Sequence, residues 1–425
     1  MRIFAQKSPL NAEISNIGSD KSISHRSAIF ALLSDRTSKI SNFLLAEDTL
    51  NTLKIVEALG AEVKRVGAEV EITPKGAIKE PNMPLECGNS GTTIRLFMGL
   101  LSSVKGFFVL SGDKYLNERP MRRIGGPLSK VGAKIYGRDN ANKAPIAIEG
   151  NKLEYFEFDS KISSAQVKTA MILAALNSNG CKFSEPELSR DHSEKMLKAM
   201  GADISTNGLE LRVEPLRASL KPLEIFVPND PSSAFYYAVA ASIIPGSHIV
   251  LKNMLLNKTR IEAYEILKKM GAKISYKKTD EIYEEIGDIE ISYAPLHAVD
   301  VSENIPWMID EAPALAVAFA CAQGKSTLKN AKELRVKECD RITVMVEGLK
   351  ACGVKASELE DGFEIMGGGE MSPAIITPHG DHRIAMSFAI LGLKCGMMIE
   401  DAKCIATSFP NFSEILKQIG ASVED

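Results

Sequence analysis

The chain has 425 residues, 45% hydrophobic and 25% charged, with a formal net charge of −3 and a sequence pI of about 6.2. This ordinary globular balance fits two or three domains and argues against a general affinity for nucleic acid or anionic lipid. Seven cysteines without a Cys-x-x-Cys pair, a start without an apolar signal segment and no apolar run of membrane-spanning length predict a reduced, cytoplasmic protein.

Six apolar helices are expected along the chain, each beginning at small or polar residues. Ser, Thr and Asp at such positions are N-cap residues, and the runs that follow are apolar almost all round, which predicts burial. The expected helix starts fall at 22–28, 90–96, 163–168, 231–235, 310–314 and 381–386. A short strand follows each helix, and a charged loop then opens a second helix.

Each second helix is expected to end at a glycine that is followed by a β-type run. A glycine takes the left-handed conformation of a helix C-cap without steric cost, and a near-constant period indicates a reused unit. The six glycines are 67 to 82 residues apart: Gly60, Gly132, Gly201, Gly271, Gly353 and Gly420. With the two strands after each cap, the sequence predicts six βαβαββ units.

The sixth unit stops after its first strand beyond the cap, so two of its strands are missing from the C-terminal end. Residues 1–6 and 12–14 read as strands, and we expect them to complete this unit. Three consecutive units then form each domain. The expected domains are 14–227 and 1–13 together with 228–425.

Cationic side chains gather at the expected helix starts. Helix N-termini carry a partial positive charge and free N–H groups, so two domains that turn these ends toward one cleft would attract anions. The basic residues at or before these starts are Lys21, Arg26, Arg119, Lys337, Arg341 and Arg383. In a nearly neutral protein this pattern favours a small polyanionic ligand.

Other motifs carry weaker signals. Residues 324–327 resemble the end of a nucleotide P-loop, but the upstream glycine is absent and a strand is expected to follow. Residues 379–382 favour a loop and helix cap over a metal site, because no third ligand is close. Residues 88–93 fit either a phosphate cradle or a tight turn. Cys87 and Cys339 are expected to be ordinary small core or loop residues.

Two carboxylates are candidates for acid–base chemistry. Asp310 stands at an expected helix start, where it acts either as an N-cap or as a base. Glu338 lies between Lys337 and Arg341, so it either forms ion pairs only or takes part in proton transfer.

The chain resembles the 3-phosphoshikimate 1-carboxyvinyltransferase (EPSP synthase) family over nearly its whole length. Eight motifs in order carry the resemblance, and together they are highly specific. They occupy residues 20–26, 88–96, 118–121, 163–168, 310–312, 334–341, 380–383 and 406–410. The resemblance implies a two-domain inside-out α/β barrel of six βαβαββ units, three in each domain, with the active site in the interdomain cleft.

The resemblance also implies a role for each matching residue. For shikimate 3-phosphate the implied ligands are Lys21, Ser22, Arg26, Ser164, Gln166, Asp310 and Lys337. For phosphoenolpyruvate they are Lys21, Gly91, Arg119, Gln166, Arg341 and Arg383, the last two as a clamp on the carboxylate. The implied catalytic residues are Asp310, Glu338, Lys21 and Lys337, with Asp310 taking the proton of the 5-hydroxyl.

In this family the 5-hydroxyl of shikimate 3-phosphate attacks protonated phosphoenolpyruvate, and a tetrahedral ketal then expels phosphate. The implied partners are these two small molecules, with no metal and no organic cofactor. The charge and hydropathy of the chain predict no nucleic acid and no membrane as partners, and a monomer is the default because no coiled coil or extra interaction segment is visible. Gly91 is compatible with binding of the inhibitor glyphosate in this family.

Several positions depart from better-known members. Thr407 stands where many carry a lysine, Ala165 where many carry a second serine, and residues 189–192 replace a serine–tyrosine pair, so none of these is assigned a role. A UDP-N-acetylglucosamine 1-carboxyvinyltransferase is the nearest alternative, but the loop 111–119 lacks the cysteine usual there, although Asp113 leaves room for its aspartate variant. A non-catalytic or RNA-end-binding relative of the fold is the other alternative.

Overall fold

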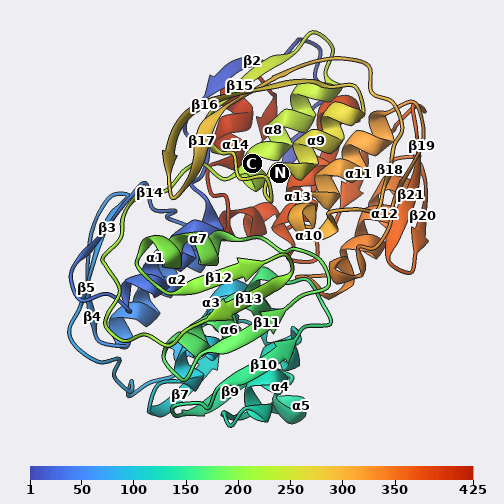
Figure 1. The fold of residues 1–425 in the computed structure, drawn as a ribbon. Coiled ribbons are helices and arrows are strands. Elements are labelled where there is room, and N and C mark those ends of the chain that lie inside the picture. Colours follow the sequence, from blue (N-terminus) through green and yellow to red (C-terminus); the bar gives the residue numbers. More distant parts are fainter. Residues whose placement is uncertain (425) are drawn as a thin grey trace. The chain divides into compact units, whose positions relative to one another are not determined.

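The computed structural model describes residues 1–424 and divides into two compact units (Figure 1). The contiguous unit is Ser19–Val227, and the discontinuous unit joins Met1–Gly18 to Pro228–Asp425. Residues 14–18, which the sequence analysis places in the first domain, therefore group with the discontinuous unit. Among the described residues, no helix is both long and apolar enough to cross a membrane.

The contiguous unit is built from three four-stranded sheets, each with two helices. The first sheet has the order β14 (Glu224–Phe226), β3 (Ser38–Ser41), β5 (Glu69–Pro74) and β4 (Ala61–Val66), and its helices are α1 (Lys21–Ala31) and α2 (Glu47–Ala58). The second has the order β6 (Leu85–Glu86), β7 (Gly106–Ser111), β9 (Lys143–Gly150) and β8 (Lys134–Gly137), with helices α3 (Gly91–Ser102) and α4 (Arg122–Lys130). The third has the order β10 (Phe156–Asp159), β11 (Cys181–Ser184), β13 (Glu210–Val213) and β12 (Ile204–Asn207), with helices α6 (Ala165–Leu176) and α7 (His192–Ala199). Short α5 (Arg138–Ala141) and η1 (Leu116–Glu118) fill connections.

The discontinuous unit repeats this plan. Its first sheet has the order β2 (Asn11–Ile14), β15 (His248–Leu255), β17 (Glu284–Ser292) and β16 (Lys273–Ile282), with helices α8 (Pro231–Ile243) and α9 (Glu262–Lys269). The second has the order β18 (Asp300–Val301), β19 (Gly324–Leu328), β21 (Gly362–Gly367) and β20 (Lys355–Leu359), with helices α11 (Ala312–Cys321) and α12 (Arg341–Ala351). The third has the order β22 (Ala374–Ile376), β23 (Met397–Ile399), β1 (Arg2–Ile3) and β24 (Val423–Glu424), with helices α13 (His382–Cys395) and α14 (Phe412–Gln418). The connections hold α10 (Ile305–Met308), η2 (Lys332–Val336) and η3 (Ala402–Thr407).

The six βαβαββ units are confirmed by one strand pattern. In every sheet the first two strands are parallel and the other two pairings are antiparallel. The expected glycine caps are confirmed as well, because all six glycines have a positive φ between 84° and 114°. A side chain at any of them would strain the backbone.

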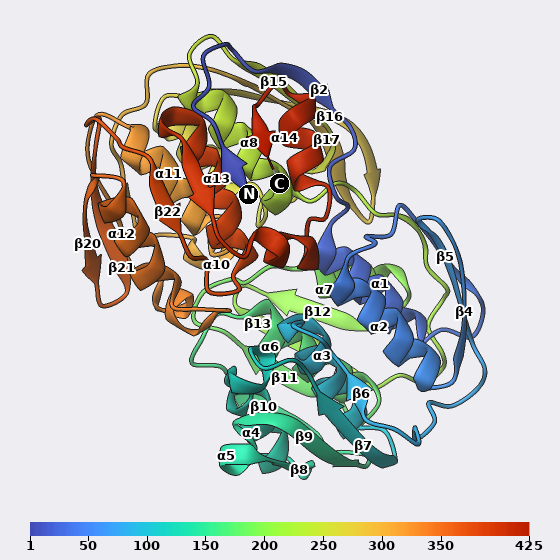
Figure 2. The same cartoon turned by 180° about the vertical axis from the view of Figure 1, so that it is seen from behind.

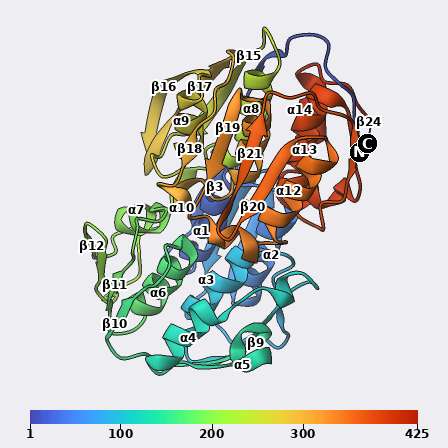
Figure 3. The ribbon, with the colours of Figure 1, turned by 90° about the vertical axis from the view of Figure 1, so that its right-hand side faces the viewer.

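The N-terminal strands differ in part from the expectation. Strand β1 pairs with β23 and β24 and completes the sixth sheet, so the two ends of the described chain lie side by side (Figures 2 and 3). Strand β2, expected in the same sheet, instead pairs in parallel with β15 and is the first strand of the fourth unit. In the same way β14 supplies the first strand of the first unit.

The first helix of each unit forms the core. Helices α8, α11 and α13 are buried along nearly their whole length, as are α3 and α6 in the contiguous unit. Because these helices are largely apolar on every side, neighbouring helices and sheets enclose them. Most of their charged side chains lie near the first turns, whereas polar groups further along, such as the hydroxyls of Ser102, Ser242 and Ser387, bond within their own helices. The candidate site lies at those first turns.

Candidate functional site

In the contiguous unit, α1, α3 and α6 each begin with a side-chain cap. Asp20 accepts a hydrogen bond from the amide of Ile23 at 2.7 Å, Ser90 from Thr93 at 3.1 Å, and Ser164 from Val167 at 3.5 Å. Each cap satisfies one free N–H of its helix, and the partial positive charge of the helix start remains. Ser164 therefore caps α6, and this hydrogen bond does not prevent its side chain from also contacting a ligand.

The two cations of α1 are held in different ways. Lys21 Nζ lies 3.1 Å from Oδ2 of Asp48 and is largely shielded from solvent. The buried guanidinium of Arg26 donates to the hydroxyl groups of Ser193 at 2.8 Å and Thr169 at 3.1 Å, and to the carbonyl oxygen of Ser22 at 3.1 Å. Arg26 is therefore fixed by oxygen atoms from α1, α6 and α7.

Gly91, the first residue of α3, lies against the guanidinium of Arg119. A Cβ added at Gly91 would be 2.8 Å from Nη1 of Arg119 and 2.9 Å from its Cζ. The absence of a side chain at Gly91 therefore leaves room for the guanidinium of Arg119 beside the amides at the start of α3. This contact favours an anion site here over the bare tight turn that the sequence left open.

Gln166 joins α6 to the same region. Its Oε1 accepts a hydrogen bond from Nη1 of Arg95 at 2.6 Å, and its Nε2 donates to Oγ1 of Thr92 at 3.0 Å. Arg95 also donates to the carbonyl oxygen of Pro120 at 3.2 Å, next to Arg119. The structure thus connects Gln166, Gly91 and Arg119 through α3.

In the discontinuous unit, Asp310 lies in the turn between α10 and α11. The N-cap residue of α11 is Glu311, and no side chain caps this helix, so Asp310 is not the cap that the sequence allowed. Its Oδ1 is 3.7 Å from Nη1 of Arg341 and 3.8 Å from Nε of Arg383. Arg383 also donates to the carbonyl oxygen of Asp310 at 3.3 Å. The carboxylate therefore sits beside two guanidinium groups.

Arg341, the first residue of α12, is held by two acids. It donates through Nε to Oδ2 of Asp381 at 2.7 Å and through Nη2 to Glu338 at 2.6 Å. Asp381 is fully buried and caps α13, accepting from the amide of Arg383 at 2.8 Å. Nη1 of Arg341 is buried and has no hydrogen-bond acceptor within residues 1–424. Oδ1 of Asp310 is 3.7 Å away, beyond hydrogen-bonding distance, so Nη1 still has hydrogen bonds to give.

The charges of this cluster shift the pKa of two groups. Burial lowers the pKa of Lys337 from 10.5 to about 8, and Asp310 opposes that shift while Arg341 adds to it. Burial acts to lower the pKa of Arg341, but Asp381 and Glu338 outweigh it and raise the pKa well above its usual value. Lys337 thus exchanges its proton near neutral pH, whereas Arg341 stays charged.

The remaining motifs of the sequence are a strand, a helix start and two cysteines. Residues 324–327 lie within strand β19 and not at a helix start, so the P-loop alternative has no structural support. His382 is the first residue of α13, and its Nδ1 lies 3.4 Å from the hydroxyl of Thr407. Burial raises the pKa of the Cys87 and Cys339 thiols, as expected for unreactive residues.

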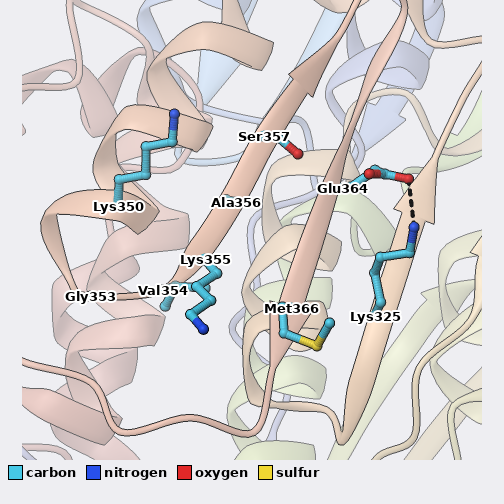
Figure 4. A pocket seen from close by; sticks show the side chains of 9 residues that line it. All are labelled: Lys325, Lys350, Gly353, Val354, Lys355, Ala356, Ser357, Glu364 and Met366. Atoms are coloured by element: carbon cyan, nitrogen blue, oxygen red, sulfur yellow. Dashed lines mark hydrogen bonds and ion pairs between the residues drawn. The ribbon is translucent and has the colours of Figure 1, made fainter.

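A separate hollow of about 580 Å³ lies on the sheet that contains β19, β20 and β21 (Figure 4). Its wall carries three lysines and a methionine: Lys325, Lys350, Lys355 and Met366. None of the sequence-predicted site residues lines it.

Four residues of these clusters were not expected from the sequence to bind or position a ligand. Arg95 and Asp48 hold Gln166 and Lys21, and Asp381 holds Arg341. Tyr236 of α8 has a buried hydroxyl without a hydrogen-bond partner among the described residues, and burial raises its pKa. The position of Asp381 at a helix start rich in cations could have indicated that it holds one of them. Nothing in the sequence indicated the roles of Asp48, Arg95 and Tyr236.

Comparisons with known proteins agree with one another. The family described as EPSP synthase (3-phosphoshikimate 1-carboxyvinyltransferase) matches residues 4–416. A 3-phosphoshikimate 1-carboxyvinyltransferase of Campylobacter hominis is 71% identical, and one of Campylobacter jejuni is 59% identical, each over 100% of both chains. The solved EPSP synthase from Acinetobacter baumannii covers 100% of this chain and 98% of its own, with a TM-score of 0.86 and 38% identity.

Proposed function

The chain belongs to the EPSP synthase family, and on that premise we propose which of its residues hold the substrates and move the protons. It transfers the enolpyruvyl group of phosphoenolpyruvate to the 5-hydroxyl of shikimate 3-phosphate and releases phosphate. Its full-length relatives favour this reaction over that of the sugar-nucleotide enzyme. The proposal concerns the site residues, the use of both units, the oligomeric state and the location.

Arg341 and Arg383 clamp the carboxylate of phosphoenolpyruvate in our proposal. The observation that carries it is the buried Nη1 of Arg341, which lacks an acceptor while the rest of the guanidinium is held by Asp381 and Glu338. A planar guanidinium with a fixed orientation suits a carboxylate, because two parallel hydrogen bonds set both distance and direction. Lys21, Gly91, Arg119 and Gln166 hold the rest of this substrate.

Shikimate 3-phosphate is bound by groups from both units. Its proposed ligands are Lys21, Ser22, Arg26, Ser164, Gln166, Asp310 and Lys337. The capped starts of α1 and α6 support the phosphate part of this proposal, since helix amides and fixed cations together favour a dianion. We assign the two units as the functional domains.

Asp310 takes the proton of the 5-hydroxyl as that oxygen attacks C2 of phosphoenolpyruvate, while Lys337 or Glu338 delivers a proton to the methylene carbon. The product of this addition is a tetrahedral ketal. Removal of a proton from the new methyl group then expels phosphate and restores the enol ether. A pKa of about 8 makes Lys337 suitable for such transfers near neutral pH. The cations offset the two phosphates and the carboxylate.

The protein works as a cytoplasmic monomer in this proposal. All seven cysteines are free thiols, as is typical of a reducing compartment. Most large exposed apolar side chains are spread over separate elements, for example Val66 on β4 and Phe107 on β7, and among the described residues the one cross-strand pair is Ile375 with Met398 on β22 and β23. Sedimentation at several concentrations tests the monomer, and a concentration-dependent dimer contradicts it.

One assay tests the reaction and the site together. Purified protein is mixed with phosphoenolpyruvate and either shikimate 3-phosphate or UDP-N-acetylglucosamine, and phosphate release is measured. We expect release with shikimate 3-phosphate alone. Release with the sugar nucleotide alone would overturn the assignment. An Arg341→Lys variant that keeps the wild-type KM for phosphoenolpyruvate would overturn the carboxylate clamp.

A further inference from the structure

A buried charge cluster lies in the contiguous unit beside the proposed ligands. Lys168 of α6 is 2% exposed, and its Nζ lies 2.9 Å from Oε1 of Glu185 and 2.8 Å from Oε1 of Glu194. The ammonium also donates to the carbonyl oxygen of Ser189 at 3.2 Å. We call Lys168, Glu185 and Glu194 the charge anchor. It joins α6, the end of β11 and α7.

The charge anchor fixes the loop between β11 and α7. Oε1 of Glu185, besides contacting Lys168, accepts a hydrogen bond from the amide of Ser189 at 3.0 Å. The amide of Glu187 donates to the hydroxyl of Ser163 at 3.0 Å, just before α6 begins. The loop is therefore attached at two places to the first turns of α6, where Ser164 and Gln166 lie.

The same two helices hold Arg26 at the positions next to the charge anchor. Thr169 follows Lys168, and Ser193 precedes Glu194. Both hydroxyl groups accept hydrogen bonds from Arg26, at 3.1 and 2.8 Å, and they lie 2.5 Å from one another. A shift of α7 relative to α6 would therefore displace the acceptors that aim Arg26.

Stability alone does not account for this cluster. Apolar side chains of similar volume often replace a buried ion pair at no cost in stability. Here one ammonium faces two carboxylates, and Oε2 of both Glu185 and Glu194 is buried without a hydrogen-bond partner in the described part of the chain. Burial favours a neutral Lys168, but the two glutamates outweigh it and raise its pKa, so the ammonium stays charged.

We propose that Lys168 is a positioning residue for shikimate 3-phosphate, which it orients without contact by fixing α6, α7 and the loop between them around Arg26. This inference rests on the proposed function, in which Arg26, Ser164 and Gln166 bind that substrate. Loss of the charge anchor should weaken shikimate 3-phosphate binding more than phosphoenolpyruvate binding, because Arg26 and Ser164 are proposed ligands of the first substrate alone and Gln166 is shared.

The test uses steady-state kinetics and thermal unfolding of four full-length variants. Lys168→Met removes the ammonium, Lys168→Arg keeps the charge, and the triple variant Lys168→Met/Glu185→Gln/Glu194→Gln removes all three charges. Lys182→Met is the matched control, because Lys182 pairs with Glu210 at 2.7 Å on the exposed face of a sheet in the same unit.

We expect Lys168→Met to raise the KM for shikimate 3-phosphate about tenfold to a hundredfold, the scale of a displacement near 1 Å. The KM for phosphoenolpyruvate should rise several times less than that for shikimate 3-phosphate, because only Gln166 among its proposed ligands lies on α6. Lys168→Arg should restore part of the loss, and the control should match wild type. The triple variant separates a positioning role of the charge anchor from a purely structural one. Because it leaves no unpaired buried charge, it should recover the melting temperature, and it should keep the raised KM for shikimate 3-phosphate because the helices are no longer fixed.

A triple variant with wild-type KM for shikimate 3-phosphate would overturn the proposal, as would failure of all three Lys168 variants to fold, which would identify the charge anchor as a folding element. Arg26→Ala and Gln166→Ala serve as reference variants. If neither raises the KM for shikimate 3-phosphate, the proposed site itself is wrong. If both raise it while folded Lys168 variants do not, only the positioning role is wrong.

Discussion

Replacement of Gly91 by alanine gives a direct test of the contact between α3 and Arg119. A Cβ at this position would approach Nη1 of Arg119 to 2.8 Å, whereas ordinary contact begins at 3.4 Å, so the guanidinium must move by about 0.6 Å. Gly91 has an ordinary helical backbone, and the obstacle is the end of a flexible side chain. Folding should therefore be unaffected or slightly favoured, because alanine suits a helix better than glycine.

Substrate binding should respond where folding does not. A displacement of this size weakens a charge-assisted hydrogen bond, which contributes about 1.5–3 kcal/mol. We expect Gly91→Ala to raise the KM for phosphoenolpyruvate by roughly ten- to a hundredfold, since each 1.4 kcal/mol is a factor of about ten. The KM for shikimate 3-phosphate should change much less.

The assay is phosphate release at varied concentrations of each substrate, with thermal unfolding in parallel. Gly126→Ala in α4 is the matched control, because the nearest atom to its added Cβ, in Arg122, is at 3.6 Å. A Gly91→Ala enzyme with an unchanged KM for phosphoenolpyruvate would show that Arg119 does not bind this substrate. A large loss of melting temperature would show that the clash disturbs the fold instead.

Three further changes test the discontinuous unit. Asp310→Asn should bind both substrates and lose about a hundredfold or more in turnover, and wild-type turnover would remove its role as base. Asp381→Asn leaves the buried Arg341 with one acidic partner fewer, so chemical denaturation should show a loss of about 3–5 kcal/mol, and a loss below 1 kcal/mol would refute the ion pair's importance. Lys337 loses its proton as the pH rises through about 8, so kcat/KM should fall above that pH. If kcat/KM of a Lys337→Met enzyme falls over the same pH range, Lys337 does not cause the fall.

The repeated unit could be predicted from the sequence because its signals are local. A glycine after a helix and a Ser or Asp before one act within a single turn. The structure confirms all six glycines and the side-chain caps Ser90 and Asp381, whereas α1 is capped by Asp20, ahead of the expected start at Ser22, and α11 has no side-chain cap. The fate of β2 could not be predicted in this way. Its partner β15 lies more than 230 residues further along the chain, and either of two sheets lacked a strand.

The candidate site could be predicted only as far as its residue types. Cations at helix starts were visible, and the resemblance assigned each one a role that is still a prediction. The partners that aim these cations are distant in sequence: Arg95 and Gln166 are 71 residues apart, and Arg341 and Asp381 are 40 apart. Asp310 is the clearest example of what the sequence could not decide, because only the structure shows that the N-cap position of α11 is Glu311.

The position of β1 between β23 and β24 has a consequence for how the protein is made. The contiguous unit leaves the ribosome in one piece and is free to fold first, whereas the residues of β1 must wait for partners about 400 positions later. At about 5–20 residues per second, synthesis of the second half takes roughly 10–40 s. Until β23 and β24 have been made, the residues of β1 lack their sheet partners, so the discontinuous unit cannot finish folding while its second half is still being synthesised.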